Sequence, residues 1–252
     1  MFFTNVLESL ELQQHLQPAF VFLPLENIQL NIMYKELIQQ LGTARLVAVS
    51  KTQPHEAIMQ LYEQGQRIFG ENKVQELVPK YEALPKDIEW HLIGHLQSNK
   101  VKFIAPFVAM IHSVDSLKLL AEIDKQAAQH QRTIDCLLQF KINDEETKFG
   151  LDINEAYALL ESATYPNLQH IRICGVMGMA SFVEDKAQIQ REFKALKQIF
   201  DTLKARYFPN EASFKEISMG MSDDYSIAVA EGSTLVRIGT LLFGARNYGN
   251  LQ

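Results

Sequence analysis

The sequence predicts a single (β/α)8 barrel of the TIM type with a helical extension at its N-terminus. Eight short apolar runs rich in β-branched residues alternate with amphipathic stretches. Apolar runs without alternation are typical of parallel strands that helices cover on both faces, and alternating strands and helices imply right-handed crossovers. The length of 252 residues also suits one barrel. An open, doubly wound sheet is the alternative, because strand order cannot be read from the sequence.

The expected elements follow the chain in regular order. The apolar runs expected as strands are residues 45–50, 67–70, 90–94, 109–114, 133–140, 171–178, 216–220 and 235–239. The stretches expected as helices are residues 26–42, 55–65, 72–84, 96–105, 116–130, 154–163, 186–207 and 222–232. Polar residues that favour helix starts precede two of them, Asp115 with Ser116 and Asn154 with Glu155. We expect residues 1–44 to form the extension and residues 45–252 the barrel, as one domain.

Composition and charge exclude several function classes. The chain is 47% hydrophobic and 21% charged, which is ordinary for a soluble globular protein. A net charge of -6 argues against a nucleic-acid partner, which requires a clustered basic face. The chain contains neither an apolar run of about 20 residues nor a signal peptide, so we expect no membrane association and a cytoplasmic location. Cys136 and Cys174 lie in apolar runs and are expected to be buried, and no metal-ligand spacing is present.

Lys51 directly follows the first expected strand, where barrels place their active-site loops. Lysine is rarely buried without a partner, and desolvation lowers its pKa, which makes the amine a nucleophile towards aldehydes. Taken alone, the residue is better explained as a lysine whose stem packs while its ammonium reaches water.

The loops after the seventh and eighth expected strands combine glycines with hydroxyl side chains. Barrels commonly bind phosphate at these two loops. Gly220 and Gly239 would let backbone N–H groups approach an anion, and Ser218, Ser222 and Thr240 would add hydroxyl donors. Each glycine alone indicates only a turn, but the two loops together indicate a phosphate site.

Five segments then carry a family resemblance, "LVAVSKTQP", "FGENKVQE", "IEWHLIGHLQSNK", "HSVDS" and "FKEISMGMSDDYSIAVAEGSTLVRIGTLLFGARNY". In this order, over residues 45–248, they resemble the pyridoxal phosphate homeostasis protein family, which is itself similar to the barrel domain of bacterial alanine racemase and of ornithine decarboxylase. The resemblance implies the racemase-like barrel of the fold type III pyridoxal phosphate (PLP) proteins. Residues 1–44 match this family weakly.

The resemblance also implies the roles of individual residues. Lys51 resembles the lysine that forms the Schiff base with PLP, and Arg237 the arginine that faces the pyridine nitrogen. Four further residues resemble the phosphate cup, and two are expected to line the pocket. The implied cofactor-binding residues are Lys51, Asn72, His95, Ser218, Gly220, Arg237, Gly239 and Thr240.

The same residues favour a binding protein over an enzyme. An arginine donates to the ring nitrogen and keeps it unprotonated, which makes the ring a weak electron sink. Racemases of this design take a tyrosine base from a second domain, which is not expected here. The residues that could replace it, none of them preferred, are His91, His95, His112, Tyr225 and Tyr248.

We therefore expect a protein that carries or stores PLP without catalytic turnover. PLP-dependent apoenzymes are the expected acceptors, and the protein is expected to be a monomer. The alternative is a PLP-dependent amino-acid racemase or lyase. A barrel that binds phosphosugars, with Lys51 contacting the sugar phosphate, is a third interpretation.

Overall fold

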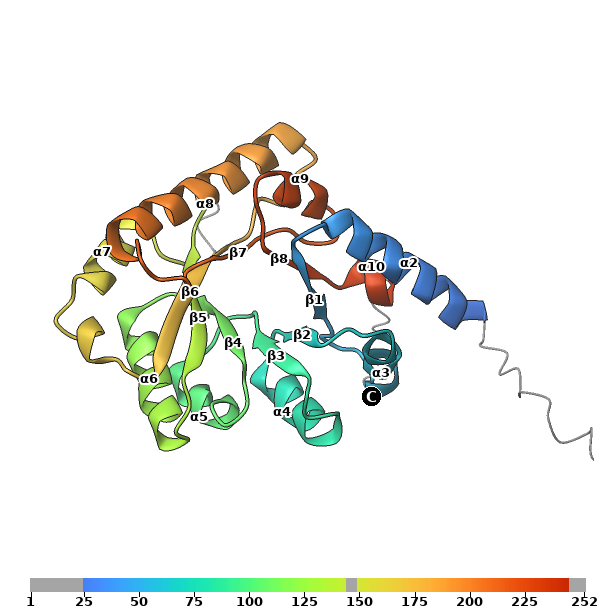
Figure 1. Cartoon of the computed structure of the whole chain (residues 1–252), viewed down its shortest axis with the longest axis horizontal. Helices are drawn as coiled ribbons and strands as arrows, with labels where there is room; N and C mark the ends of the chain where they lie inside the picture. Colours follow the sequence, from blue (N-terminus) through green and yellow to red (C-terminus); the bar gives the residue numbers. More distant parts are fainter. Residues whose placement is uncertain (1–24, 144–148, 245–252) are drawn as a thin grey trace, which may run out of the picture.

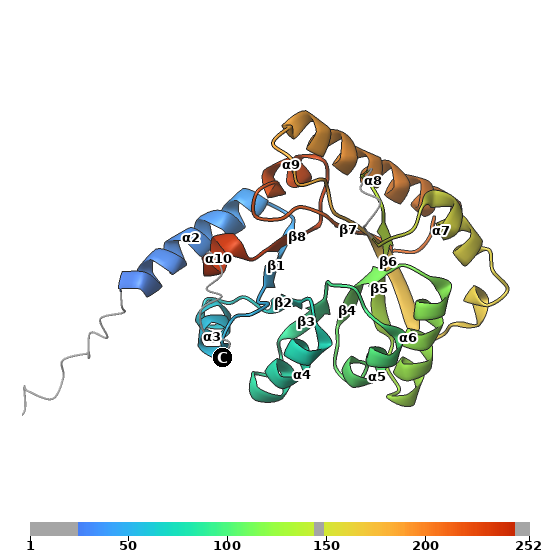
Figure 2. The same ribbon diagram turned by 180° about the vertical axis from the view of Figure 1, so that it is seen from behind.

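The computed structural model of the protein describes residues 25–143 and 149–244. Eight parallel strands pair in the order β1 to β8, and β8 pairs with β1, which closes the barrel. Figure 1 and Figure 2 show the strands at the centre with the helices around them. The predicted barrel is confirmed, and the closing pair of β1 and β8 excludes the open sheet.

The observed strands agree with the predicted runs to within about two residues at each end. They are β1 (Arg45–Val49), β2 (Ile68–Glu71), β3 (Glu89–Leu92), β4 (Met110–Val114), β5 (Ile134–Phe140), β6 (Ile171–Gly178), β7 (Glu216–Ser218) and β8 (Leu235–Ile238). The helices are α2 (Leu25–Leu41), α3 (His55–Glu63), α4 (Val74–Ala83), α5 (Val101–Ile104), α6 (Leu117–Gln129), α7 (Ile153–Leu160), α8 (Lys186–Tyr207), α9 (Tyr225–Ala230) and α10 (Thr240–Phe243), with 3₁₀ turns η1 (Ser98–Lys100) and η2 (Tyr165–Asn167).

The strands carry apolar residues on both faces because their alternate residues face two different cores. On β1, Leu46 and Ala48 belong to the large core between the sheet and the helices, whereas Val47 belongs to a smaller cluster with Leu137 and Leu235. Successive side chains of a strand point to opposite faces. The barrel interior is therefore filled by side chains rather than open, as is usual for this fold.

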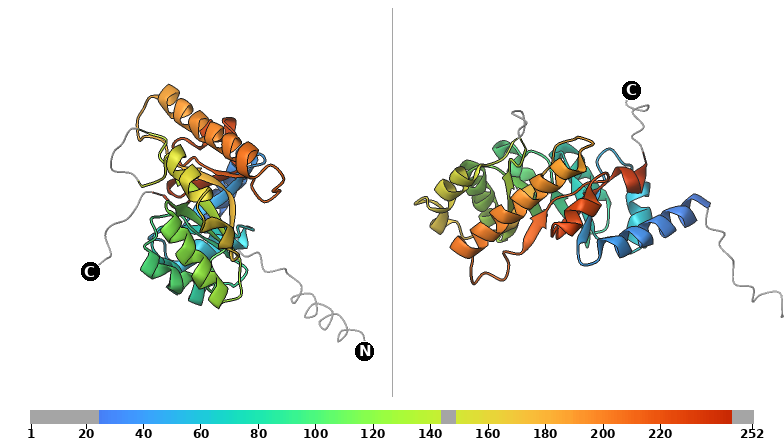
Figure 3. Two further views of the ribbon diagram at one scale, coloured as in Figure 1. Left: turned by 90° about the vertical axis from the view of Figure 1, so that its left-hand side faces the viewer. Right: turned by 90° about the horizontal axis from the view of Figure 1, so that it is seen from above.

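Helix α2 attaches the N-terminal extension to the barrel. It packs against β1, α9 and α10 and lies along the outside of the barrel, as the view from above in Figure 3 shows. Tyr34, Leu37 and Leu41 bury one face of the helix, and the Tyr34 hydroxyl donates to Oε1 of Gln66 at 3.1 Å. The expected helix is thus confirmed as part of the barrel's own packing. Residues 1–24 lie outside the described residues.

Two local expectations need correction. Helix α7 begins at Ile153, and its N-cap is Asp152 rather than Asn154, because Asp152 and Glu155 form a reciprocal capping box. The helix expected at 96–105 is instead η1 followed by the four residues of α5. The cap expected at Ser116 is confirmed, since its side chain accepts from the Leu119 N–H. Across the described residues, no helix combines the length and apolar character that a membrane span requires.

Candidate functional site

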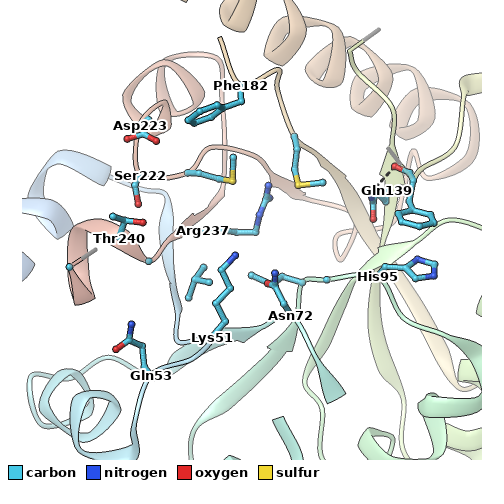
Figure 4. Close-up of a pocket in the computed structure, with 18 residues that line it drawn as sticks. Lys51, Gln53, Asn72, His95, Gln139, Phe182, Ser222, Asp223, Arg237 and Thr240 are labelled. Carbon is cyan, nitrogen blue, oxygen red and sulfur yellow. Dashed lines mark hydrogen bonds between the residues drawn. The ribbon is translucent and has the colours of Figure 1, made fainter. Parts of the chain in front are cut away.

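A pocket of about 580 Å³ opens at the carboxyl ends of the strands. Figure 4 shows the Lys51 and Arg237 side chains extending into it, with Ser222 and Thr240 on one side and His95 and Gln139 on the other. Six of the eight predicted cofactor-binding residues line this pocket, namely Lys51, Asn72, His95, Arg237, Gly239 and Thr240. The structure thus brings together residues from the ends of β1, β2, β3 and β8.

The backbone at Lys51 is held in one conformation by its following residue. Thr52 has a φ of 62°, which is rare for a β-branched residue. Its N–H donates to Oε2 of Glu76 at 2.7 Å, and its hydroxyl donates to the Lys51 carbonyl at 2.6 Å. A side chain of α4 therefore fixes the turn that presents Lys51 to the pocket.

A buried ion pair holds the residue before Lys51. The Ser50 hydroxyl donates to Oε1 of Glu71 at 2.7 Å, and Nζ of Lys80 donates to the Ser50 carbonyl at 2.7 Å and to the same Glu71 oxygen at 2.6 Å. All three residues are buried, and Oε2 of Glu71 has no hydrogen-bond partner among the residues that the structure describes. Burial raises the pKa of Glu71, and the charge of Lys80 opposes that shift. These residues were not predicted, because a lysine on a helix and a glutamate at a strand end carry no signal of burial.

Arg237 is a buried cation on β8. Only 5% of the residue is exposed, and burial lowers the pKa of its guanidinium to about 10, so it stays protonated at neutral pH. Its Nη1 donates to Oγ of Ser218 at 2.6 Å, and its Nη2 donates to the Gly178 carbonyl at 3.1 Å. No carboxylate forms an ion pair with Arg237 within the described parts of the chain.

A hydroxyl-rich corner lies beside the amine and the guanidinium. Ser222 and Thr240 come together there, from the loop after β7 and from the start of α10. Oγ of Ser222 accepts from the Leu241 N–H at 3.4 Å. Gly239 lies close to β1, since a Cβ at this position would be 3.1 Å from the Val49 carbonyl oxygen. The corner therefore offers hydroxyl and backbone donors to an anion.

Ser218 and Gly220 lie outside the residues that line the pocket. Ser218 is fully buried, and its hydroxyl oxygen contacts Arg237 and His112. Gly220 has a φ of 92°, and a Cβ there would be 2.5 Å from the Cβ of Ala228. Gly220 is thus explained by the turn that packs α9 onto β7, and the arrangement favours Ser222 over Ser218 as the serine that faces an anion.

His95 lines the pocket and contacts two neighbouring side chains. Its ring stacks on that of Phe149, with centroids 4.0 Å apart and an angle of 16° between the planes. Its Nδ1 lies 3.6 Å from Oδ2 of Asp115. The histidine therefore contributes to the wall of the pocket opposite Ser222 and Thr240.

Of the other residues considered as a second base, the three that the structure describes do not line the pocket. His91 and His112 are buried inside the barrel, and burial lowers the pKa of both, that of His91 to about 3. The Tyr225 hydroxyl donates to Oε1 of Gln40 at 2.5 Å. Tyr248 lies outside the described residues. Within the part of the chain that the structure describes, none of these three side chains can act as a base beside Lys51.

Several lining residues were not predicted. They are Gln53, Gln139, Phe149, Met179, Phe182, Met221 and Asp223. Gln139 and Met179 lie at the carboxyl ends of β5 and β6, so the general rule that barrel sites form at strand ends could have found them. Phe149 and Phe182 come from loops, and no feature of the sequence marks them.

The fold and the pocket define a class of protein. A family model, "Alanine racemase, N-terminal domain", matches residues 25–247, so the chain belongs to that family. The structure of alanine racemase from Bartonella henselae is 17% identical, covers 87% of this chain and 59% of its own, and has a TM-score of 0.64. At this identity the likeness shows a shared barrel.

Closer relatives narrow the assignment to one branch of these barrels. The pyridoxal phosphate homeostasis protein of Aquifex aeolicus is 40% identical over 206 residues, which cover 81% of this chain and 88% of the relative. The Escherichia coli K12 protein of the same name is 38% identical over 210 residues, covering 81% and 86%. The structure of PipY from Synechococcus elongatus with PLP bound is 37% identical, with a TM-score of 0.76 and coverage of 85% and 100%. The chain belongs to the pyridoxal phosphate homeostasis protein family.

Proposed function

We propose that the protein binds PLP in this pocket, where the amine of Lys51 forms a Schiff base with the cofactor aldehyde. Membership of the PLP homeostasis family makes it a PLP-binding protein. One observation carries the assignment of the site: an amine at a strand end and a buried guanidinium line the same cavity, next to a corner of hydroxyl groups, and no carboxylate of the described residues pairs with the guanidinium. This donor set fits an anionic aldehyde.

The roles of the residues follow from their chemistry. Bound PLP supplies a reactive aldehyde and a phosphate dianion. Lys51 supplies the primary amine, and Arg237 donates a hydrogen bond to the ring nitrogen, which stays unprotonated because a guanidinium has no acceptor. Ser222 and Thr240 donate hydroxyl hydrogen bonds to the phosphate, joined by backbone N–H groups near Gly239.

The proposal extends to storage and delivery of the cofactor without turnover. The family is one of non-catalytic PLP-binding proteins. An arginine at the ring nitrogen leaves the ring a weak electron sink, which supports a binding role. We place this activity in the cytoplasm, where free buried thiols such as Cys136 and Cys174 are usual. PLP-dependent apoenzymes are the proposed acceptors, and a monomer suffices because one chain supplies all the pocket residues named.

Absorption spectroscopy and chemical trapping test the site. Purified protein loaded with PLP should show the visible band of a Schiff base, and borohydride should reduce it and label a single peptide that contains Lys51. The Lys51→Ala variant should lose the label while its melting temperature changes little, because the turn is held through backbone groups. A label that persists at one residue in this variant would overturn the assignment.

A transfer assay tests the carrier role against the racemase or lyase alternative. Holoprotein mixed with an excess of a PLP-dependent apoenzyme should lose its visible band as the acceptor gains activity. Holoprotein incubated with single L-amino acids should produce neither the D-isomer nor a keto acid. Sustained turnover would contradict the carrier role and favour the enzyme.

A further inference from the structure

Four polar side chains form a continuous row through the barrel interior. Nη1 of Arg237 contacts Oγ of Ser218 at 2.6 Å, Oγ of Ser218 contacts Nδ1 of His112 at 2.9 Å, and Nε2 of His112 contacts Nδ1 of His91 at 2.9 Å. These residues come from β8, β7, β4 and β3, and each is at most 5% exposed. We call this row the Arg237–His91 relay. It connects the pocket with the interior at the opposite end of the barrel.

The protons of the relay can be assigned starting from its first residue. A guanidinium only donates, so the Ser218 oxygen accepts from Arg237. Ser218 is fully buried, and among the described residues its other hydrogen-bond partner is Nδ1 of His112, so we assign the hydroxyl proton to this contact because a buried donor without an acceptor is costly. Nδ1 of His112 is therefore unprotonated, and its proton lies on Nε2, which donates to Nδ1 of His91. His91 then carries its own proton on Nε2. Both imidazoles are neutral, in agreement with the low pKa that burial gives each of them.

The last donor of the relay reaches a second cavity. His91 lines a cavity of about 280 Å³ at the amino ends of the strands, together with Arg45, Glu89 and Glu216. A polar cavity of this size has room for water, and water accepts hydrogen bonds from imidazole N–H groups such as Nε2 of His91. Each hydrogen bond in the relay thus has one donor and one acceptor, and every bond is donated in the same direction, from the pocket towards this cavity.

The relay orients Arg237 without neutralising it. The two hydrogen-bond acceptors of the guanidinium among the described residues, the Ser218 hydroxyl and the Gly178 carbonyl, are both uncharged. Asp224 raises the pKa of Arg237 through its charge but forms no ion pair with it. A carboxylate would fix the guanidinium equally well, but it would cancel the charge that an anionic ligand meets. Neutral acceptors in a buried site leave that charge in place.

We propose that Ser218, His112 and His91 are positioning residues for Arg237, which hold its guanidinium towards the pocket and keep its positive charge uncompensated for the bound cofactor. The proposal rests on the proposed function, since it takes PLP as the ligand of the pocket. It assigns Ser218 a role through Arg237 instead of a contact with phosphate.

Nitrogen NMR of the histidines tests the relay without cofactor. In ¹⁵N-histidine-labelled apoprotein, the signals of His91 and His112, assigned with His91→Gln and His112→Gln variants, should report an unprotonated Nδ1 and a protonated Nε2. This state should persist from about pH 8 to about pH 5, where an unperturbed histidine becomes charged. A proton on Nδ1 of His112, or a charged ring in this range, would overturn the relay.

Variants of Ser218 test the effect on the cofactor. Ser218→Ala removes the acceptor of Arg237, so PLP affinity should fall about tenfold and the visible band should shift, while borohydride still labels Lys51. The matched control is Ser233→Ala, because Ser233 is also buried near the end of β7 but bonds only to backbone carbonyls, Met219 O at 2.8 Å among them. The control should lower the melting temperature without changing affinity or spectrum.

A second pair of variants separates positioning from packing. His112→Gln keeps an amide that can accept and donate, and should retain more PLP affinity than His112→Phe, which keeps the ring volume without the nitrogens. Equal affinity and equal spectra in wild type, Ser218→Ala and His112→Phe would overturn the positioning role. Failure of wild-type protein to be labelled at Lys51 would instead overturn the proposed function, and the NMR experiment would still decide the relay.

Discussion

The two ends of the barrel use arginine in opposite ways. At the amino ends of the strands, Arg45 pairs with Glu216 at 2.8 Å and Arg172 with Asp135 at 2.7 Å, and both arginines are about half exposed. At the carboxyl ends, Arg237 is buried, and its acceptors in the described part of the chain are uncharged. The first arrangement satisfies its charges within the protein and links β1 with β7 and β6 with β5. The second leaves a charge to be satisfied by a ligand, so one end of the barrel serves the fold and the other serves binding.

The largest effect is expected from removing the cation at the binding end. Arg237→Gln should weaken PLP binding by about a hundredfold or more, since a charge-assisted hydrogen bond and the field of a buried charge are both lost. The apoprotein should melt at the same temperature or higher, because a buried charge without a charged partner is costly to the fold. Titration by absorbance measures the PLP affinity, and thermal melting measures the stability of the apoprotein. A large fall in apoprotein stability with unchanged affinity would show that Arg237 serves the fold rather than binding.

A smaller effect is expected from lowering the pH, which acts on the neutral histidines inside the barrel, between its two ends. His91 and His112 stay neutral in the fold, His91 with a pKa of about 3, but bind protons near pH 6.5 when unfolded. The unfolded state then holds more protons, so the free energy of unfolding should fall by about 1.4 kcal/mol per pH unit for each histidine as the pH drops below about 6.5. Urea unfolding of wild type and His91→Gln from about pH 7 to about pH 5 measures this slope. In the variant the slope of the free energy of unfolding against pH should be half as steep, because one of the two histidines is absent. Equal slopes would show that His91 is charged in the folded protein.

The smallest effect is expected at the other end. Arg172→Gln breaks the ion pair with Asp135, but both side chains are partly exposed to solvent. Such pairs contribute less than about 1 kcal/mol to stability. PLP affinity should not change, because the pair lies at the amino ends of the strands, away from the pocket. A measurable loss of affinity in this variant would show that the two ends are coupled.

The barrel could be predicted because each strand is a buried apolar run, and burial on both faces leaves a clear pattern in the sequence. The end of the first strand pointed to Lys51, the family resemblance added Asn72 and Arg237, and all three line one pocket. How far below the pocket opening a strand residue lies could not be predicted from the sequence. Ser218 ends β7 as Lys51 follows β1, yet Ser218 lies below the pocket, because the stagger of strands in a barrel decides which inward residue reaches the opening.

Features that depend on particular side-chain contacts were also missed. Asp152 rather than Asn154 caps α7, because Asp152 and Glu155 bond to each other's backbone N–H groups. The Glu71–Lys80 pair joins β2 to α4, and a sequence shows two ordinary charged residues there. Phe149 and Phe182 reach the pocket from loops whose course follows from tertiary packing.

The turn at Lys51 bears on how fast the pocket can be filled and emptied. A β-branched residue with a φ of 62°, as at Thr52, stores about 1–3 kcal/mol of strain and persists only where its surroundings hold it. Because Glu76, Glu71 and Lys80 hold the backbone on both sides of Lys51, this backbone should stay in place when a ligand enters or leaves. The rates of capture and release should then be governed by passage between the side chains at the pocket mouth, where Phe182 is 87% exposed.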